Sequence, residues 1–169
     1  MGSRRTHPSC KIEHFEDNEW EKVRARINKE SKLKFILRVL SILWASPYTL
    51  LGLCIGMVGV CAGGHVRVRG RVIEFYGGGV KWFLQRLPGG QFTLAMTLGH
   101  TILGQTDAAL DISHDHEMVH VRQYERWGPF MGPAYLICML VLWLMGCRPY
   151  HDNPFEREAY NETDGNDLK

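Results

Sequence analysis

A run of 24 residues without a charged side chain, "VLSILWASPYTLLGLCIGMVGVCA" from Val39 to Ala62, constrains the fold of this chain most strongly. About 20 apolar residues in a helix suffice to cross the hydrocarbon core of a bilayer. The preceding stretch "RARINKESKLKFILR" is rich in Lys and Arg, which favours a cytoplasmic N-terminus. Pro47 would kink such a helix without preventing it. We expect residues 36–63 to form a transmembrane or membrane-anchoring helix, the alternative being a long buried helix of a soluble protein.

A second apolar run, "FMGPAYLICMLVLWLMGC" at residues 130–147, has 18 residues. That length is at the lower limit for a helix that spans a bilayer. A membrane span and a buried helix fit this run equally well.

Composition narrows the possible functions. The 169 residues are enough for one domain with a core of its own. Twenty Lys and Arg against 18 Asp and Glu leave a formal charge of +2, and no basic stripe is interleaved with aromatic residues, so nucleic acid is not an expected partner. The five cysteines lack the close pairs of zinc ribbons, and four of them lie in or beside the apolar runs. We interpret them as small buried apolar side chains without disulfides.

The segment between the apolar runs predicts a small sheet. In "HVRVRGRVIEFYGGG", apolar and charged residues alternate on both sides of Gly70, which is typical of an antiparallel hairpin. "VKWFLQRL" fits a short helix or another strand. "QFTLAMTLGHTIL" is rich in Thr and bulky apolar residues and predicts a strand, with a bend at Gly99. The expected fold class is α+β, with a small antiparallel sheet followed by a helix and with two long apolar helices.

The string "HEMVH" at residues 116–120 lies in a segment that predicts a helix of about four turns, with Asp111 or Ser113 as N-cap and an end at the pair Gly128-Pro129. Residues four apart share one helix face, so both imidazoles can reach one metal ion. Glu117 can take a proton from a metal-activated water. Catalytic zinc normally has three protein ligands, so a third must come from elsewhere in the chain.

The segment "DNPFEREAYNE", residues 152–162, follows the second apolar run and offers Glu156 and Glu158. With the HExxH string, it resembles the gluzincins, metallopeptidases whose third zinc ligand is a Glu on a later helix, often in an E-x-x-A-[D/N] string. "EREAY" matches this string except at Tyr160, where Asp152 or Asn161 would have to orient a ligand His instead. The resemblance implies that His116, His120 and Glu156, rather than Glu158, bind Zn²⁺.

The continuation "HVRQYERWG" is also similar to small membrane zincins of unassigned function, and this similarity covers about residues 111–160. The gluzincin resemblance implies a zinc metallopeptidase with Glu117 as general base. It also implies that the strand "FTLAMTLGHTIL" could hold an extended peptide by edge pairing.

Topology limits how the second apolar run can be placed. If residues 130–147 crossed a bilayer once, the two His and Glu156 would lie on opposite sides of about 30 Å of hydrocarbon. An irregular polar return through lipid would leave backbone groups unpaired. We therefore expect this run to pack as a buried or re-entrant helix beside the first, with the metal site at the membrane surface.

These observations predict a charged N-terminal segment at residues 1–35, the anchoring helix at 36–63, a zincin-like domain at 64–162 that includes the helix at 130–147, and a polar tail at 163–169. The predicted function is that of a membrane-associated zinc metallohydrolase, with membrane lipid and a peptide or protein substrate as partners. The alternative is a non-catalytic membrane protein in which a metal ties the motif helix to the C-terminal segment.

Overall fold

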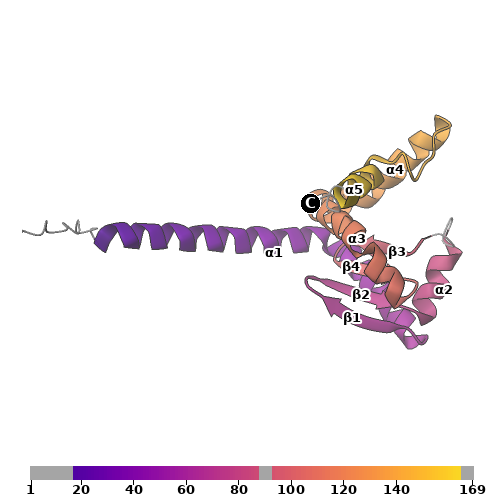
Figure 1. Ribbon diagram of the computed structural model, residues 1–169, viewed down its shortest axis with the longest axis horizontal. Helices are drawn as coiled ribbons and strands as arrows, with labels where there is room; N and C mark the ends of the chain where they lie inside the picture. The colour runs from indigo at the N-terminus through magenta and orange to yellow at the C-terminus, as the bar shows by residue number, and fades with distance from the viewer. Residues whose placement is uncertain (1–16, 88–92, 165–169) are drawn as a thin grey trace, which may run out of the picture. The chain divides into compact units, whose positions relative to one another are not determined.

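The computed structural model describes residues 17–87 and 93–164. The chain forms two compact units, Met1–Arg38 and Val39–Lys169, and each is described by itself. The described part of the first unit is helical, and the second unit contains a sheet with helices around it. In chain order the elements are α1 (Asp17–Cys61), β1 (His65–Arg69), β2 (Val72–Tyr76), α2 (Gly78–Arg86), β3 (Ala95–Leu98), β4 (Thr101–Gly104), α3 (Asp107–Trp127), the 3₁₀-helix η1 (Gly128–Phe130), α4 (Met131–Leu144) and α5 (Pro154–Asp164) (Figure 1).

The four strands form one mixed sheet in the order β1-β2-β4-β3. β1 and β2 pair antiparallel, as the alternating pattern predicts, and β3 pairs antiparallel with β4. β2 and β4 are parallel, with Ile73 opposite Thr101 and Tyr76 opposite Gly104. The expected antiparallel pairing is therefore confirmed for two of the three strand pairs, but the sheet is mixed and not strictly antiparallel. The chain leaves β2 through α2 and returns so that β4 enters beside β2 in the same direction, a connection that local alternation does not reveal.

Several local expectations are resolved by the structure. "VKWFLQRL" lies in α2 and is helical. "FTLAMTLGHTIL" contains two strands rather than one bent strand, because Gly99, at φ 63°, and His100 form a tight turn between β3 and β4. The N-cap of α3 is Thr106, not Asp111 or Ser113, and its hydroxyl accepts a hydrogen bond from the Ala109 amide at 3.1 Å. At 21 residues α3 is longer than the four turns expected, because it starts five to seven residues earlier.

Helices cover both faces of the sheet. On one face, Val72 and Ile102 pack against Leu110 and Val121 of α3. On the other face, Phe75 and Leu103 pack against α2, and Leu53, Ile55 and Val60 of α1 pack against the same cluster. The second unit is therefore built in three layers: α3, the sheet, and the C-terminal part of α1 with α2.

Three glycines let α1 approach the sheet closely. A Cβ atom at Gly52 would lie 2.7 Å from the Cβ of Thr101, one at Gly56 would overlap the ring of Phe75, and one at Gly59 would overlap Val80. α1 continues through Pro47 as one helix. The last four turns of α1 therefore carry one buried face, spaced at helical intervals, and one exposed apolar face.

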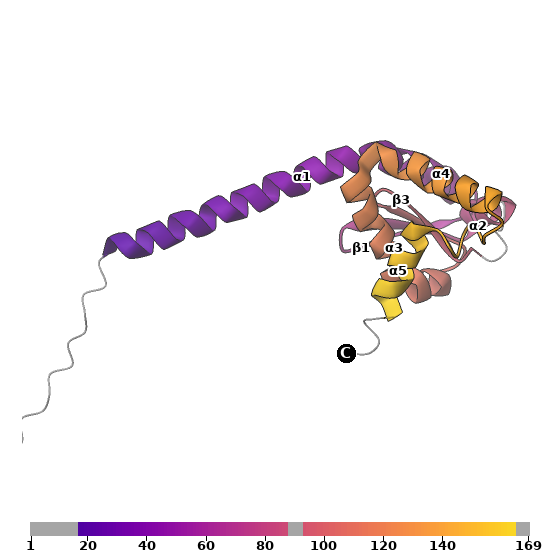
Figure 2. The same cartoon turned by 90° about the horizontal axis from the view of Figure 1, so that it is seen from above.

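α4 packs against α1 only near its N-terminus. Met131 belongs to a buried cluster with Ala45, and a Cβ at Gly132 would overlap Tyr48. Met131 is the only fully buried residue of α4. Of the two expected placements, a helix buried within the protein is thus wrong, and the outer side chains of α4 are exposed. Figure 2 shows α4 and the end of α1 along the upper edge of the second unit, with α3 and α5 below them.

Two helical stretches, Glu19–Cys61 and Asp107–Leu144, are long and apolar enough to cross a membrane. The cysteines of the described residues are all free. Cys54, Cys61 and Cys147 are exposed and Cys138 is half-buried, so their interpretation as buried side chains is wrong. Cys54 and Cys61 lie on the outer side of α1 and Cys147 follows α4, where an apolar sequence does not imply burial within the protein. The first cysteine, Cys10, lies outside the described residues.

Candidate metal centre

α3 places the two motif histidines one turn apart on one face. The Nε2 atoms of His116 and His120 are 3.2 Å from each other. Their ring planes are 80° apart, so the two nitrogens converge on one point rather than stacking. The spacing of four residues along the helix produces this convergence, as the sequence predicts.

α5 brings Glu156 to the same point. The helix starts at Pro154, and the buried Asn153 before it fixes the start: its Oδ1 accepts from the Phe155 amide at 3.1 Å and its Nδ2 donates to the Tyr135 carbonyl at 3.3 Å. Oε2 of Glu156 is then 3.3 Å from Nε2 of His116, and Oε1 is 3.5 Å from Nε2 of His120.

Glu158 points elsewhere. Its carboxylate accepts hydrogen bonds from Gln123 and Arg126 of α3, each at 2.9 Å. Of the two glutamates that the sequence left open, Glu156 is the one that lies with His116 and His120. All three residues offer ligand atoms within 4.8 Å of one another.

The donor set fits a zinc ion. Zn–N and Zn–O bonds of about 2.0–2.2 Å in a tetrahedron separate neighbouring ligand atoms by about 3.3 Å, close to the distances found here. Oε2 of Glu156 is buried and has no hydrogen-bond partner among the described residues, an arrangement that normally costs stability. A cation bound between the two imidazoles would satisfy this oxygen.

Neighbouring groups hold the three side chains in place. The Nδ1–H of His120 donates to Oε1 of Gln123 at 2.8 Å, an assignment that leaves the lone pair of Nε2 free for a metal. The hydroxyl of Tyr135 donates to Oε1 of Glu156 at 2.8 Å, which leaves Oε2 as the free oxygen. The ring of Tyr160 packs on His116, with centroids 4.7 Å apart. Tyr160 therefore orients a histidine by packing, where an amide or carboxylate would do so by hydrogen bonding.

The electrostatics of the cluster favour a positive charge. Burial opposes ionisation of Glu156, yet the close imidazoles of His116 and His120, at 3.3 and 3.5 Å from its oxygens, hold the pKa of its carboxyl well below the usual range. Burial likewise opposes protonation of His120, but its hydrogen bond with Glu156 and the nearby charge of Glu117 raise its pKa to about 9. A buried carboxylate between two imidazoles is thus suited to hold a cation.

Glu117 is buried between α3 and the sheet. Its Oε2 accepts a hydrogen bond of 2.7 Å from the hydroxyl of Thr97, on the strand β3. β3 is the outer strand of the sheet formed by the described residues. The residue expected to act as a base is therefore oriented by the strand that was expected to hold a peptide.

The remaining histidines of the described residues lie outside this cluster. His114 contacts the buried carboxylate of Glu74 at 3.0 Å, and His100 contacts Glu125 at 3.1 Å. His65 stacks on Tyr76, and His151 packs edge-on against Tyr150. Their contacts are with the sheet, with α3 or with a loop, as expected for histidines that are not ligands.

Sequence reasoning missed two positioning residues. Tyr135 lies in the apolar run, where a tyrosine gives no sign that its hydroxyl reaches a carboxylate 21 residues later. Thr97 lies in a strand pattern that explains it without a site. Gln123 was recognisable as a neighbour of the His face, because it follows His120 by three residues in a helix.

Comparison of the chain with known protein families, with curated proteins and with solved structures finds no match. A functional assignment therefore rests on the residues of the cluster and on their geometry.

Proposed function

We propose that this protein is a membrane-associated zinc metallohydrolase, a peptidase of gluzincin type, in which His116, His120 and Glu156 bind Zn²⁺ and Glu117 is the general base. The observation that carries the proposal is the convergence of His116 and His120 on Oε2 of Glu156, a buried oxygen with no hydrogen-bond partner in the described part of the chain. Three ligands from two helices leave a fourth tetrahedral position for water or substrate.

The side chains around the cluster suit hydrolysis of a carbonyl compound. When bound, Zn²⁺ supplies Lewis acidity that polarises a carbonyl and favours ionisation of water. Glu117 takes a proton from the attacking water and delivers it to the leaving amine. Thr97 positions the carboxylate of Glu117 through the 2.7 Å hydrogen bond to Oε2.

A peptide is the substrate class that the strand arrangement supports. β3 lies against α3. Among the described strands it is an edge strand, so an extended peptide could pair along its outer edge. A peptide added along this edge runs beside Glu117, because Thr97 in the middle of β3 contacts Glu117 directly. Backbone pairing would give affinity with little demand on side-chain sequence.

Zinc content tests the metal centre. We would purify the protein in detergent and measure zinc per chain by mass spectrometry for wild type, Glu156→Gln and Glu158→Gln. The two variants remove a carboxylate from the same helix, but only Glu156 faces the histidines. We expect about one zinc in wild type and Glu158→Gln and a large loss in Glu156→Gln. Equal zinc in both variants would exclude Glu156 as a ligand.

Replacement of the base tests catalysis. In Glu117→Gln the zinc content should stay near one per chain, whereas hydrolysis of a quenched peptide library should fall by about a hundredfold or more. A structural metal that only ties α3 to α5 predicts no peptide hydrolysis by wild type. The direct contacts Gln123–Phe155 and Arg126–Glu158 already join these helices, which favours the catalytic interpretation over the structural one.

A further inference from the structure

The exposed apolar surface of the second unit is larger than packing within the protein requires. It is formed by the outer side chains of α1 and α4, which we call the apolar face. Soluble monomers rarely leave a continuous apolar surface of this kind in water. The face consists of Leu50, Leu51, Met57, Val58, Leu136, Ile137, Leu140, Val141, Trp143, Leu144 and Met145.

α1 has no segment that is both long enough to cross a bilayer and free of the sheet. Its last charged residue is Arg38, and from Trp44 onward it packs on the second unit: Trp44 contacts Phe130, with ring centroids 6.1 Å apart, and the Thr49 hydroxyl accepts from the His100 amide at 3.0 Å. Only residues 39–43 of α1 lie between the last charged residue, Arg38, and the first packed residue, Trp44. A crossing helix needs about 20 residues surrounded by lipid.

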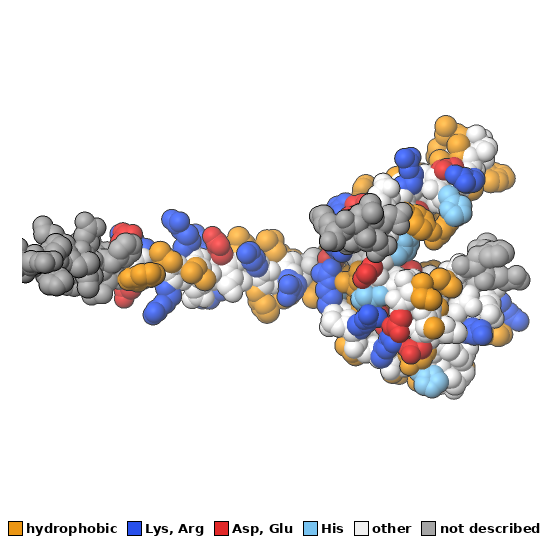
Figure 3. Space-filling view, viewed as in Figure 1, with side chains coloured by type: hydrophobic (Ala, Val, Ile, Leu, Met, Phe, Trp, Pro, Cys, Tyr) orange, Lys and Arg blue, Asp and Glu red, His pale blue; other side chains and the backbone are white. Residues whose placement is uncertain are grey.

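The sheet on which α1 packs cannot enter the hydrocarbon core with it. The opposite face of the sheet carries charged groups, with Arg67 paired to Glu74, Asp107 and Asp111, and Arg71 paired to Glu125. Figure 3 shows acidic and basic side chains together on the visible surface of this unit. Moving such groups into lipid would cost several kcal/mol each.

α4 is also too short to cross a bilayer, and the chain that follows it returns to the first turns of α4. From Tyr135 to Leu144 the helix rises about 14 Å at 1.5 Å per residue, less than half of the roughly 30 Å of hydrocarbon. Asn153 then donates a hydrogen bond to the carbonyl of Tyr135, and Glu156 accepts one from the Tyr135 hydroxyl. The segment after α4 therefore ends on the side from which α4 started.

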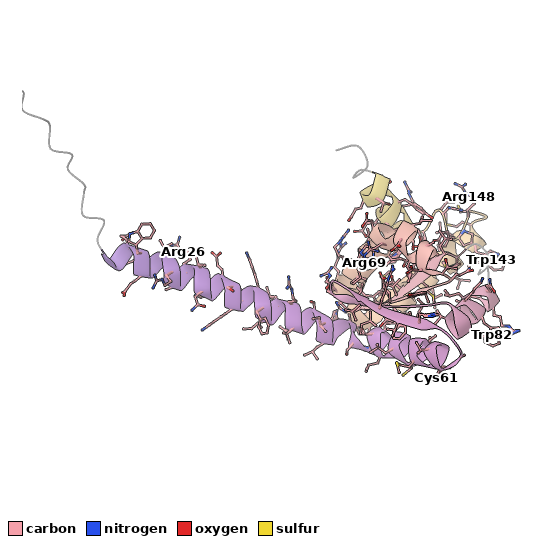
Figure 4. The ribbon with its side chains drawn as sticks, turned by 60° about the horizontal axis from the view of Figure 1, so that its bottom comes forward. Arg26, Cys61, Arg69, Trp82, Trp143 and Arg148 are labelled. Atoms are coloured by element: carbon pink, nitrogen blue, oxygen red, sulfur yellow. The ribbon has the colours of Figure 1, made fainter. Side chains whose placement is uncertain are left out.

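Aromatic and basic side chains lie at the same end of the unit as the tip of α4. Trp82 of α2 is exposed, and the guanidinium of Arg86 lies 4.0 Å from its ring centroid. Trp143 lies in the last turn of α4 and Arg148 follows the helix, and Figure 4 shows Trp82, Trp143 and Arg148 on one side of the unit. An apolar groove of about 710 Å³ between α1 and α2 joins Val58 of the apolar face to Trp82. Trp and Arg are the side chains that favour the headgroup region.

We propose that α1 and α4 insert their apolar face into one leaflet of a phospholipid bilayer, so that the protein binds the membrane from one side without crossing it. Apolar side chains occupy the acyl region, and Arg86 and Arg148 meet lipid phosphates at its border. The metal centre then lies below the first turns of α4, on the aqueous side of the same leaflet, because Tyr135 joins α4 to Glu156.

Vesicle binding tests the surface with a matched pair of variants. Ile137 on α4 and Ile112 on α3 are both exposed, at 60% and 77%, but only Ile137 belongs to the apolar face. With sedimented vesicles of phosphatidylcholine and phosphatidylglycerol, we expect Ile137→Glu to weaken partitioning at least about tenfold and Ile112→Glu to leave it unchanged. Equal effects of the two variants would overturn the proposal. So would a stable dimer in solution that does not bind vesicles, since a second copy would then cover the face.

Labelling distinguishes one-sided insertion from crossing. In a background with all cysteines replaced by alanine, Glu21→Cys, Asp115→Cys and Arg148→Cys are added singly to the full chain. The protein is bound to the outside of preformed vesicles and treated with a membrane-impermeant maleimide. One-sided insertion predicts that all three positions react fully without detergent. Protection of any one of them until detergent is added would show that the chain crosses and would overturn the proposal.

Discussion

Gln123 is fully buried and joins three parts of the candidate metal centre. It accepts from His120, donates to the Phe155 carbonyl and donates to Glu158. Replacing it by Met keeps its size and removes all three hydrogen bonds. Because the proposed metal ligand His120 loses its orienting partner, we expect zinc affinity to fall about 10–100-fold in Gln123→Met, measured by competition with a zinc-binding dye.

A matched glutamine separates this effect from a general loss of hydrogen bonds. Gln105 follows the last residue of β4 and donates from Nε2 to the Thr93 carbonyl at 2.6 Å. Gln105→Met should leave zinc affinity within about twofold of wild type, since no ligand is oriented by Gln105. Equal losses of affinity in both variants would mean that Gln123 acts through stability and not through His120.

Arg67 is the second residue whose replacement should have a large effect. Its Nε donates to the carboxylate of Glu74 at 2.5 Å, and Glu74 is fully buried. The pKa of Arg67 is raised, chiefly by this hydrogen bond. Removing the guanidinium leaves a buried carboxylate with His114 as its remaining partner. We expect Arg67→Met to lower the free energy of unfolding by about 3–5 kcal/mol, measured by urea denaturation in detergent.

Arg69 provides the control for that measurement. It pairs with Asp111 at 2.9 Å, but both side chains are largely exposed, so Arg69→Met should change stability by less than about 1 kcal/mol. The double variant Arg67→Met/Glu74→Met should recover part of the loss, because it removes the unpaired charge together with its partner. An Arg67→Met variant as stable as wild type would contradict this account of the buried Glu74 carboxylate.

At the scale of elements, the glycines of α1 distinguish a packed helix from one surrounded by lipid. In a free helix Gly→Ala stabilises by about 1 kcal/mol, because glycine has a low helix propensity. At Gly56 the added Cβ would overlap the ring of Phe75. We therefore expect Gly56→Ala to destabilise by about 1–3 kcal/mol in urea denaturation. Met57→Ala, on the exposed face, should have little effect in detergent, and a stabilised Gly56→Ala would refute packing of α1 on the sheet.

The sequence predicts elements better than it predicts their pairing. The hairpin of β1 and β2 follows from alternation around Gly70, and the end of the helix that carries His116 and His120 is predicted correctly because Gly128 ends it. The parallel pairing of β2 and β4 was not predictable, because it depends on the path of the chain through α2. The sequence at 39–62 predicts a candidate span, because an apolar helix face with glycines can pack on a sheet or lie in lipid, and the residue types do not distinguish the two.

At the scale of the molecule, the candidate site also combines local features that the sequence predicts with long-range contacts that it does not. The helical spacing of His116 and His120 is a local property, and the structure brings them together as expected. That Glu156 rather than Glu158 joins them depends on Asn153, which anchors the start of α5 on the carbonyl of Tyr135. The fold of the second unit therefore brings Glu156 to the histidines, a pairing that the sequence suggests only through its resemblance to the gluzincins.

The division of the chain into two units predicts that they contribute separately to membrane binding. Basic side chains outnumber acidic ones in residues 1–38, and juxtamembrane Lys and Arg favour anionic lipid by up to about 1 kcal/mol each. The apolar face lies wholly in residues 39–169. A chain that starts at Val39 should therefore keep its binding to pure phosphatidylcholine vesicles and lose most of its added affinity for vesicles that contain phosphatidylglycerol.

The same truncation should leave the metal centre intact. All three proposed ligand residues lie in the second unit, and the packing contacts of α1 described above begin at Trp44, so zinc content and unfolding temperature in detergent should match those of the full chain. Raising the salt concentration should weaken binding of the full chain to anionic vesicles and affect the truncated chain much less, because salt screens charges and leaves apolar contacts in place. Loss of binding to neutral vesicles on truncation would instead place the principal membrane contact in residues 1–38 and contradict insertion through α1 and α4.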